Sequence, residues 1–160
     1  MAKSDHSRAV RSWVAMTSRL VSLALDANDT RGLARFWAEA LGYVEQPPPA
    51  GFATWDDFLR EQQVPESEWN AFNAVIDPDG AGPRLFFQRV PEPKQGKVRV
   101  HLDLNVGGGR DAPEDERRAR VDAAVGRLVA LGAEQIRTYE ERGERWVAMR
   151  DPEGTEFDLQ

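Results

Sequence analysis

The sequence contains no cysteine among its 160 residues. This absence excludes disulfides, thiolate metal sites and cysteine nucleophiles, and it leaves the cytoplasm as the default expectation for the compartment. The sequence also lacks any run of about 18 apolar residues, so we expect no transmembrane helix. Residues 1–18 have neither the long apolar core nor the cleavage pattern of a secretory signal, and we expect none there.

Basic residues are fewer than acidic residues in this sequence. The 21 Lys and Arg residues oppose 27 Asp and Glu residues, which gives a net charge of −6. We expect no nucleic-acid partner, because affinity for nucleic acid comes largely from neutralising phosphates. Arg117, Arg118 and Arg120 do cluster, but acidic residues such as Glu114 precede them on the same predicted helix. This order predicts a solvated helix face.

What the sequence does contain is the same unit twice. Three landmarks recur in the same order in both halves, namely a strand-like run at residues 21–26 and 100–105, an Ala-Leu-Gly at residues 40–42 and 130–132, and an Asp-Pro-acid-Gly turn at residues 77–80 and 151–154. The repetition predicts a duplicated α+β module, with a site between the two halves.

Each half has the pattern of a βαβββ unit. Apolar residues at helical spacing predict one buried face per helix, made of Leu33, Phe36, Trp37, Ala40 and Leu41 in the first and of Val121, Ala124, Val125, Leu128 and Val129 in the second. Alternation and turn residues predict strands at residues 20–27, 43–45, 71–77 and 84–90, and again at 97–105, 133–139, 144–150 and 155–159.

These elements divide the chain into an N-terminal extension over residues 1–18 and one domain over residues 19–160. Within the domain we expect module one at residues 19–90, a linker at 91–96 and module two at 97–160.

Module one carries an insertion at residues 46–70 that is rich in aromatic residues and has no counterpart in module two. Its Trp55 and Trp69 are predicted either to form a lid over a planar ligand or to fill a small satellite core or a dimer contact.

Four segments resemble a known family: residues 33–43, 85–94, 99–104 and 149–157. They are similar to the glyoxalase-like branch of the vicinal oxygen chelate superfamily, which includes glyoxalase I, extradiol dioxygenases, fosfomycin-resistance proteins and bleomycin-binding proteins. The resemblance implies an α+β fold, in which two tandem βαβββ modules form a curled mixed sheet with a concave cleft and helices on the outer face. It also implies a small-molecule ligand, a homodimer and, in metal-dependent members, one divalent ion such as Zn, Ni, Mn or Fe.

In metal-using relatives, the first and last strands of each module supply the ligands. The matching positions in this sequence are Ser22, His101, Asp158 and Phe86, with Gln88 as a substitute if the register slips. Only His101 and Asp158 are good ligands for a divalent ion, so the resemblance leaves metal binding open.

Strand alternation adds further candidates for the cleft. Asp103, Glu156 and Trp146 are expected to face it, with Glu156 as a candidate catalytic base and Trp146 as a wall for the ligand. His101 is expected either to bind a metal with Asp158 or to act as a hydrogen-bonding residue paired with Asp103 or Asp158. In the strand expected at residues 97–105, the residues predicted to point toward the helices are Val100, Leu102 and Leu104.

Three functions remain open from the sequence. One is a metal-assisted lyase, isomerase or dioxygenase, in which the ion acts as a Lewis acid on a substrate with two vicinal oxygens. Another is a metal-free protein that binds a small molecule or an antibiotic of the bleomycin type. The third is an interaction domain with a degenerate pocket.

Overall fold

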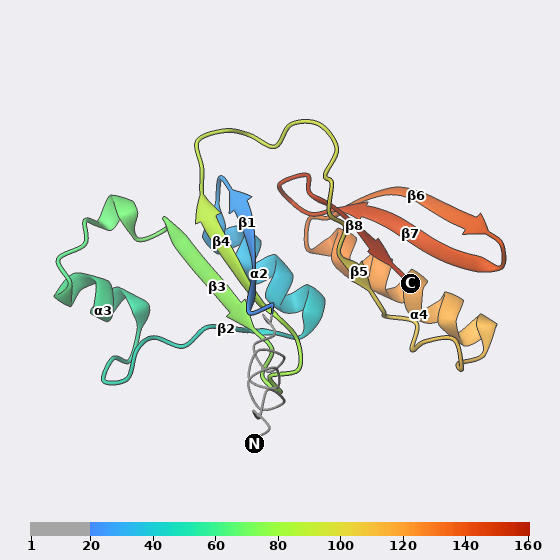
Figure 1. The fold of residues 1–160 in the computed structure, drawn as a ribbon, viewed down its shortest axis with the longest axis horizontal. Helices are drawn as coiled ribbons and strands as arrows, with labels where there is room; N and C mark the ends of the chain where they lie inside the picture. Colours follow the sequence, from blue (N-terminus) through green and yellow to red (C-terminus); the bar gives the residue numbers. More distant parts are fainter. Residues whose placement is uncertain (1–19) are drawn as a thin grey trace, which may run out of the picture.

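The computed structural model describes residues 20–160, so the N-terminal extension expected over residues 1–18 lies outside the described residues. The fold is α+β and consists of two modules, each with a four-stranded mixed sheet (Figure 1). The curled sheet implied by the resemblance is therefore made of two separately hydrogen-bonded units. Within residues 20–160 there is no helix long and apolar enough to cross a membrane.

Module one places its long helix on one face of its sheet. Its strands are β1 (Ser22–Ala27), β2 (Val44–Glu45), β3 (Phe72–Ile76) and β4 (Arg84–Arg89), in the spatial order β1-β4-β3-β2. Strands β1 and β4 are parallel, whereas β3 is antiparallel to both of its neighbours. Helix α2 (Thr30–Leu41) lies behind this sheet in Figure 1.

The ends of α2 follow from local sequence. The Asp29 side chain accepts a hydrogen bond from the Gly32 backbone N–H at 3.1 Å and so caps the first turn. Gly42 ends the helix with a φ of 70°, a left-handed conformation that costs glycine little. The predicted apolar face is confirmed, since Leu33, Phe36 and Trp37 are all buried.

The insertion contains two short helical pieces, α3 (Trp55–Glu61) and the 3-10 helix η1 (Glu66–Glu68). Thr54 caps α3, because its hydroxyl accepts a hydrogen bond from the Asp57 backbone N–H at 3.1 Å. In Figure 1 the segment extends beyond the β2–β3 side of the sheet.

Module two repeats the plan. Its strands are β5 (Asp103–Leu104), β6 (Glu134–Glu141), β7 (Glu144–Arg150) and β8 (Glu156–Leu159), in the order β5-β8-β7-β6. Its helix is α4 (Glu114–Ala130), where Val121, Ala124 and Leu128 are buried as predicted. Val129 is 47% exposed, so its assignment to the buried face was wrong.

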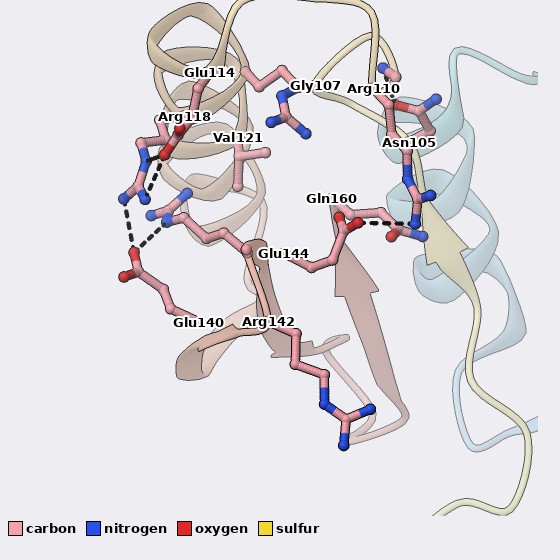
Figure 2. Close-up of a pocket in the computed structure, with 14 residues that line it drawn as sticks. Asn105, Gly107, Arg110, Glu114, Arg118, Val121, Glu140, Arg142, Glu144 and Gln160 are labelled. Atoms are coloured by element: carbon pink, nitrogen blue, oxygen red, sulfur yellow. Dashed lines mark hydrogen bonds and ion pairs between the residues drawn. The ribbon is translucent and has the colours of Figure 1, made fainter.

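The charged side of α4 behaves as expected for a solvated helix face over part of its length. Arg118 pairs with Glu114 at 2.9 Å and with Glu140 of β6 at 2.7 Å (Figure 2), and Arg120 pairs with Glu116 at 2.7 Å. Two of these three contacts join residues one helical turn apart, the spacing at which opposite charges meet on a helix.

The strand predicted over residues 97–105 was wrong in length, because only β5 pairs as a strand. The Val98 backbone N–H donates to the carboxylate of Glu156 at 3.2 Å instead of to a backbone carbonyl. Val100 is 70% exposed and does not point into the helix layer, whereas Leu104 is buried as expected. Backbone pairing with β8 reaches back to Leu102, whose carbonyl accepts a hydrogen bond from the Asp158 N–H at 3.0 Å, and only a side chain of β8 binds Val98 before it.

The two modules share one core at the junction between α2 and β8. Trp37 is fully buried and meets Phe157 of β8 edge-on at a ring distance of 5.2 Å. Its indole N–H donates to the buried carboxylate of Asp151 at 3.2 Å. Nearby, the backbone N–H groups of Asn28 and Asp29 both donate to Glu153 at 2.6 Å.

Candidate functional site

Strand register identifies which positions in the two modules correspond. In module one Ala24 pairs with Phe86, and in module two Asp103 pairs with Asp158. Ser22 lies two residues before Ala24, as His101 lies two residues before Asp103. Phe86 is therefore the structural counterpart of Asp158, and Ser22 is the counterpart of His101.

His101 and Asp158 lie together on the face of the second sheet that points away from α4. His101 Nδ1 is 3.1 Å from a carboxylate oxygen of Asp158, and the two side chains are 35% and 16% exposed. Asp103 pairs with Asp158 through its strand position and is exposed. The His101–Asp158 contact is the hydrogen-bonded pair expected as one of the two alternatives for this histidine.

The counterpart positions in module one hold no metal-ligating groups. The Ser22 hydroxyl is buried without a hydrogen-bond partner among the described residues. Phe86 stacks on Phe72 with ring centroids 5.6 Å apart. Gln88 lies two residues after Phe86 in β4, and its side-chain amide donates a hydrogen bond to the Asp26 carboxylate at 2.7 Å. The amide of Gln88 is thus engaged by a neighbouring carboxylate.

A divalent ion does not fit the donor set of residues 20–160. In this part of the chain, no group of three or more His, Asp or Glu side chains converges on one point. Ions of this kind usually take three or four protein ligands, or fewer together with several waters. His101 and Asp158 supply two at most, and they contact each other.

Glu156, the candidate base, has a lowered pKa. Burial acts to raise the pKa of this carboxyl, but the Lys94 ammonium at 3.0 Å and the Val98 backbone N–H outweigh burial and lower it. A lowered pKa keeps the carboxylate ionised and weakens it as a proton acceptor near neutral pH. Glu156 therefore fits the role of partner to Lys94 in a structural ion pair better than the role of a catalytic base.

Trp146 lies on the same sheet face, because Ala148, two residues further along β7, pairs with Asp158. Its ring stacks on Tyr139 of β6 at 5.1 Å with an interplanar angle of 10°. The stacked pair places aromatic surface on β6 and β7 at this face of the sheet. Tyr139 already covers one side of the Trp146 ring.

The insertion forms a second candidate site, on module one. Trp55 and Trp69 line a cavity of about 180 Å³ together with Phe72, Phe86 and Arg84 of the sheet. Phe86 and Arg84 alternate along β4 with the buried Leu85, so both belong to the sheet face opposite α2. The structure thus brings Trp55, Trp69 and Phe86 together and places them on a different module from His101.

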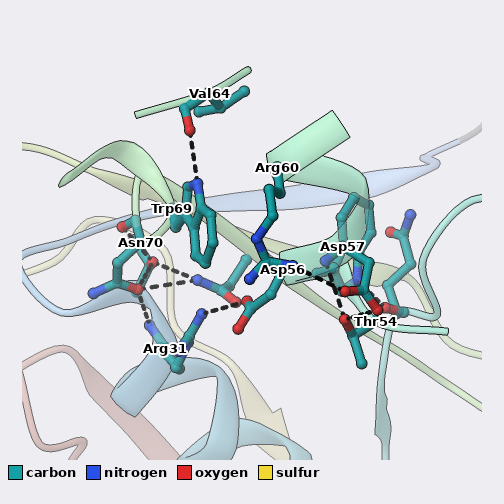
Figure 3. A network of polar contacts seen from close by, with 12 residues as sticks. Arg31, Thr54, Asp56, Asp57, Arg60, Val64, Trp69 and Asn70 are labelled. Carbon is teal, nitrogen blue, oxygen red and sulfur yellow. Dashed lines mark hydrogen bonds and ion pairs between the residues drawn. The ribbon is translucent and has the colours of Figure 1, made fainter. Parts of the chain in front are cut away.

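Hydrogen bonds within the segment hold the two tryptophans in place. The Trp55 indole N–H donates to the Gln46 carbonyl at 2.7 Å, and the Trp69 indole N–H donates to the Val64 carbonyl at 2.9 Å (Figure 3). Arg84 donates to the Gln46 side chain at 2.6 Å. Because both indole N–H groups are satisfied internally, the rings present their apolar surfaces to the cavity.

Polar contacts also fasten the insertion to α2. Arg31 of α2 lies 3.6 Å from Asp56 of α3 (Figure 3). Asn70 accepts a hydrogen bond from the Thr30 hydroxyl at 2.8 Å and donates one to Asp29 at 3.0 Å. The Asp29 pKa is lowered, first by the Asn70 side chain and then by the Gly32 backbone N–H. These contacts pre-form the cavity before any ligand binds.

Sequence reasoning missed Phe72 and Arg84 as parts of this cavity. Phe72 is 61% exposed, and Arg84 lies over the Phe86 ring at 4.7 Å. A signal was available in the sequence, because Phe72 directly follows the aromatic insertion at the start of the strand predicted over residues 71–77.

Comparison with known proteins agrees with the fold. The structure of a glyoxalase/bleomycin resistance protein/dioxygenase family enzyme from Burkholderia phytofirmans PsJN matches with a TM-score of 0.58 and 15% identity, covering 89% of this chain and 97% of that chain. The fosfomycin resistance protein FosX from Mesorhizobium loti matches with a TM-score of 0.59 and 12% identity, covering 91% and 92%. At such identities the likeness concerns the fold alone.

A third structure, of a FosX variant from Listeria monocytogenes, matches with a TM-score of 0.58 and 16% identity, covering 91% of this chain and 93% of that chain. That protein is in complex with Mn(II) and 1S,2S-dihydroxypropylphosphonic acid. No curated protein sequence matches this chain.

A family model carries the assignment further than these distant structures. The model described as Glyoxalase-like domain matches residues 22–160, which is nearly all of the chain that the structure describes. The match includes both βαβββ modules and the insertion between β2 and β3. The chain therefore belongs to the glyoxalase-like domain family.

Proposed function

We propose that this protein binds a small, flat organic molecule in the cavity between the insertion and the open face of the first sheet. The observation that carries the proposal is the meeting of Trp55 and Trp69 with Phe72 and Phe86 around one space of about 180 Å³. An apolar cavity of about 150 Å³ is enough to hold benzene. The ligand is therefore a single ring or a small fused ring system.

The charges around the cavity favour a ligand without net charge. Arg31 and Arg84 are balanced by Glu45 and Glu68 among the lining residues. Arg31 is also close to Asp56, and Arg84 is hydrogen-bonded to Gln46. Aromatic stacking and burial of apolar surface, rather than ion pairing, supply the affinity in this proposal.

The test is calorimetric titration of the protein with indole, phenol and 2-naphthol as probes. One of them is expected to bind with one-to-one stoichiometry. Trp69→Ala and Phe86→Ala should each weaken that binding about 10-fold, which corresponds to about 1.4 kcal/mol, because each removes an aromatic wall.

Trp146→Ala is the matched control, since it removes an aromatic ring that is stacked on the open face of the other sheet. Its affinity for the probe should equal that of the unaltered protein. If Trp146→Ala weakens binding and Trp69→Ala does not, the ligand sits on module two and the proposal is wrong.

We do not favour a metal-assisted lyase, isomerase or dioxygenase, because His101 and Asp158 supply at most two donors and contact each other. With two donors, we expect chelator-treated protein to show no one-to-one binding of micromolar affinity when titrated with nickel, zinc, manganese or anaerobic ferrous iron. Tight stoichiometric binding that is lost in both His101→Ala and Asp158→Ala would contradict this expectation and restore the enzyme hypothesis. Homodimerisation, which the resemblance implies, stays a prediction.

A further inference from the structure

Module two contains a larger cavity, of about 430 Å³, that neither candidate function uses. It lies between the first half of α4, the β6–β7 hairpin and the loop over residues 105–110 (Figure 2). Arg145, which lines it, alternates along β7 with Trp146, so it belongs to the sheet face opposite Trp146 and Asp158. This arginine cavity is thus on the helix side of the sheet, away from the His101–Asp158 pair.

Its lining is dominated by guanidinium groups. The charged residues around it are Arg110, Arg117, Arg118, Arg142 and Arg145 together with Glu114, Glu140 and Glu144. Counted with Asp122, which binds Arg145, these side chains carry an excess of one positive charge, five against four, in a chain whose net charge is −6. A concentration of one sign against the overall balance attracts ligands of the opposite sign.

Three of these arginines are held by carboxylates. Arg118 is bound by two glutamates at 2.9 and 2.7 Å, Arg110 lies 2.9 Å from Glu144, and Arg145 lies 2.7 Å from Asp122. The Arg145 side chain is only 18% exposed. In the part of the chain that the structure describes, Arg117 and Arg142 form no ion pair.

Two guanidinium nitrogens beside the cavity also lack acceptors. Arg117 Nε and Arg145 Nη1 are buried and have no hydrogen-bond partner within residues 20–160. A buried charged donor without an acceptor costs free energy, and such groups are normally satisfied in proteins. An anion in the cavity would let these guanidinium groups turn toward an acceptor.

We propose that the arginine cavity binds a small dianion whose oxygens are carried by phosphate or carboxylate groups. Arg117 is its principal partner, and Arg142, whose side chain points away from the other lining residues in Figure 2, turns inward to join it. The forked donors of arginine match the paired oxygens of both groups. Arg118 and Arg145, fixed by their carboxylates, shape the walls and add to the positive potential. The proposal is independent of the ligand suggested for the insertion cavity.

The experiment titrates the full chain with inorganic phosphate and, separately, with malonate, by calorimetry in a buffer of low ionic strength that contains neither. At least one anion should bind with one-to-one stoichiometry, and added sodium chloride should weaken it through screening. Stronger binding of phosphate identifies a phosphate ligand, and stronger binding of malonate identifies a carboxylate ligand.

Two variants test the assignment to this cavity. Arg117→Gln and Arg142→Gln should each lower the affinity about 10-fold, through loss of a charge-assisted hydrogen bond. Arg142 is in the exposed hairpin turn, so its replacement tests the cavity even if Arg117→Gln fails to fold.

Arg137→Gln is the control, because it removes the same charge from module two at a residue that lies over Tyr139, outside the cavity. Its affinity should stay unchanged. The proposal is overturned if neither anion binds. It is also overturned if all three variants bind the anion as tightly as the unaltered protein does.

Discussion

Replacing Trp37 by alanine should lower the free energy of unfolding by about 3 to 5 kcal/mol, the range for truncating a large aromatic residue in a core. Trp37 is fully buried, and its ring makes edge-on contacts with Phe36 at 5.5 Å and Phe157 at 5.2 Å. The contact with Phe157 joins α2 of module one to β8 of module two. The cavity left by the variant would lie where the modules meet, and neither module can collapse into it alone.

Urea unfolding followed by circular dichroism would measure this loss. Trp55→Ala is the matched control, because that tryptophan is 36% exposed and belongs to the insertion. It should change the free energy of unfolding far less. A loss below about 1 kcal/mol in Trp37→Ala would mean that the junction between the modules contributes little to stability.

The second large effect is expected at Asp151, whose carboxylate caps the turn before β8. It accepts hydrogen bonds from the backbone N–H groups of Glu153 at 3.0 Å and Thr155 at 2.9 Å, and from the Trp37 indole at 3.2 Å. Asp151→Ala leaves these donors without the acceptor, and the Trp37 donor is deeply buried. We expect a loss of about 2 to 3 kcal/mol in the free energy of unfolding, measured by urea unfolding.

Two further variants separate the parts of this effect. Asp151→Asn keeps an oxygen for the two turn amides but presents an NH₂ group where Trp37 needs an acceptor, so it should lose less stability than Asp151→Ala. Asp77→Ala alters the matching turn of module one, where the carboxylate accepts, among the described residues, only from backbone N–H groups. If Asp77→Ala proves as damaging as Asp151→Ala, the contact with Trp37 is not the cause.

The effect of Asp151 should also depend on pH. Burial raises the pKa of its carboxyl above the ordinary value of 3.8, against the hydrogen bonds from Thr155, Trp37 and Glu153, which lower it. Between 3.8 and the raised value the folded protein binds more protons than the unfolded chain, so this contribution to stability is lost as pH rises. The stability difference between the unaltered protein and Asp151→Ala should therefore shrink from acid toward neutral pH. A difference that grows over this range would contradict the raised pKa.

The βαβββ plan of each module could be predicted from the sequence, because its signals are local. Asp29 and Gly42 mark the ends of α2 through capping and left-handed backbone, and both act within one helical turn. The strands after the two Asp-Pro turns were predicted because side chains alternate at every second residue. In β8, for example, Phe157 and Leu159 alternate with Glu156 and Asp158, and both are fully buried.

Where the prediction was wrong, a contact between distant segments had replaced a local preference. Residues 97–102 alternate like a strand, but the Val98 N–H is bound by the Glu156 side chain 58 residues away. Val100 is exposed, although its residue type favours a strand interior. No pattern within the segment itself indicates that partner.

The sequence by itself determined the duplicated module, the positions of both long helices and of every strand except β5, and the absence of ligand types at Ser22 and Phe86. Only the tertiary structure decided that Trp55 and Trp69 meet Phe72 and Phe86 around one cavity, and that Arg117 and Arg142 line another. The reason is physical. Periodicity and capping report neighbours within a few residues of one another, whereas a cavity is formed by side chains from several segments whose distance depends on how whole layers pack.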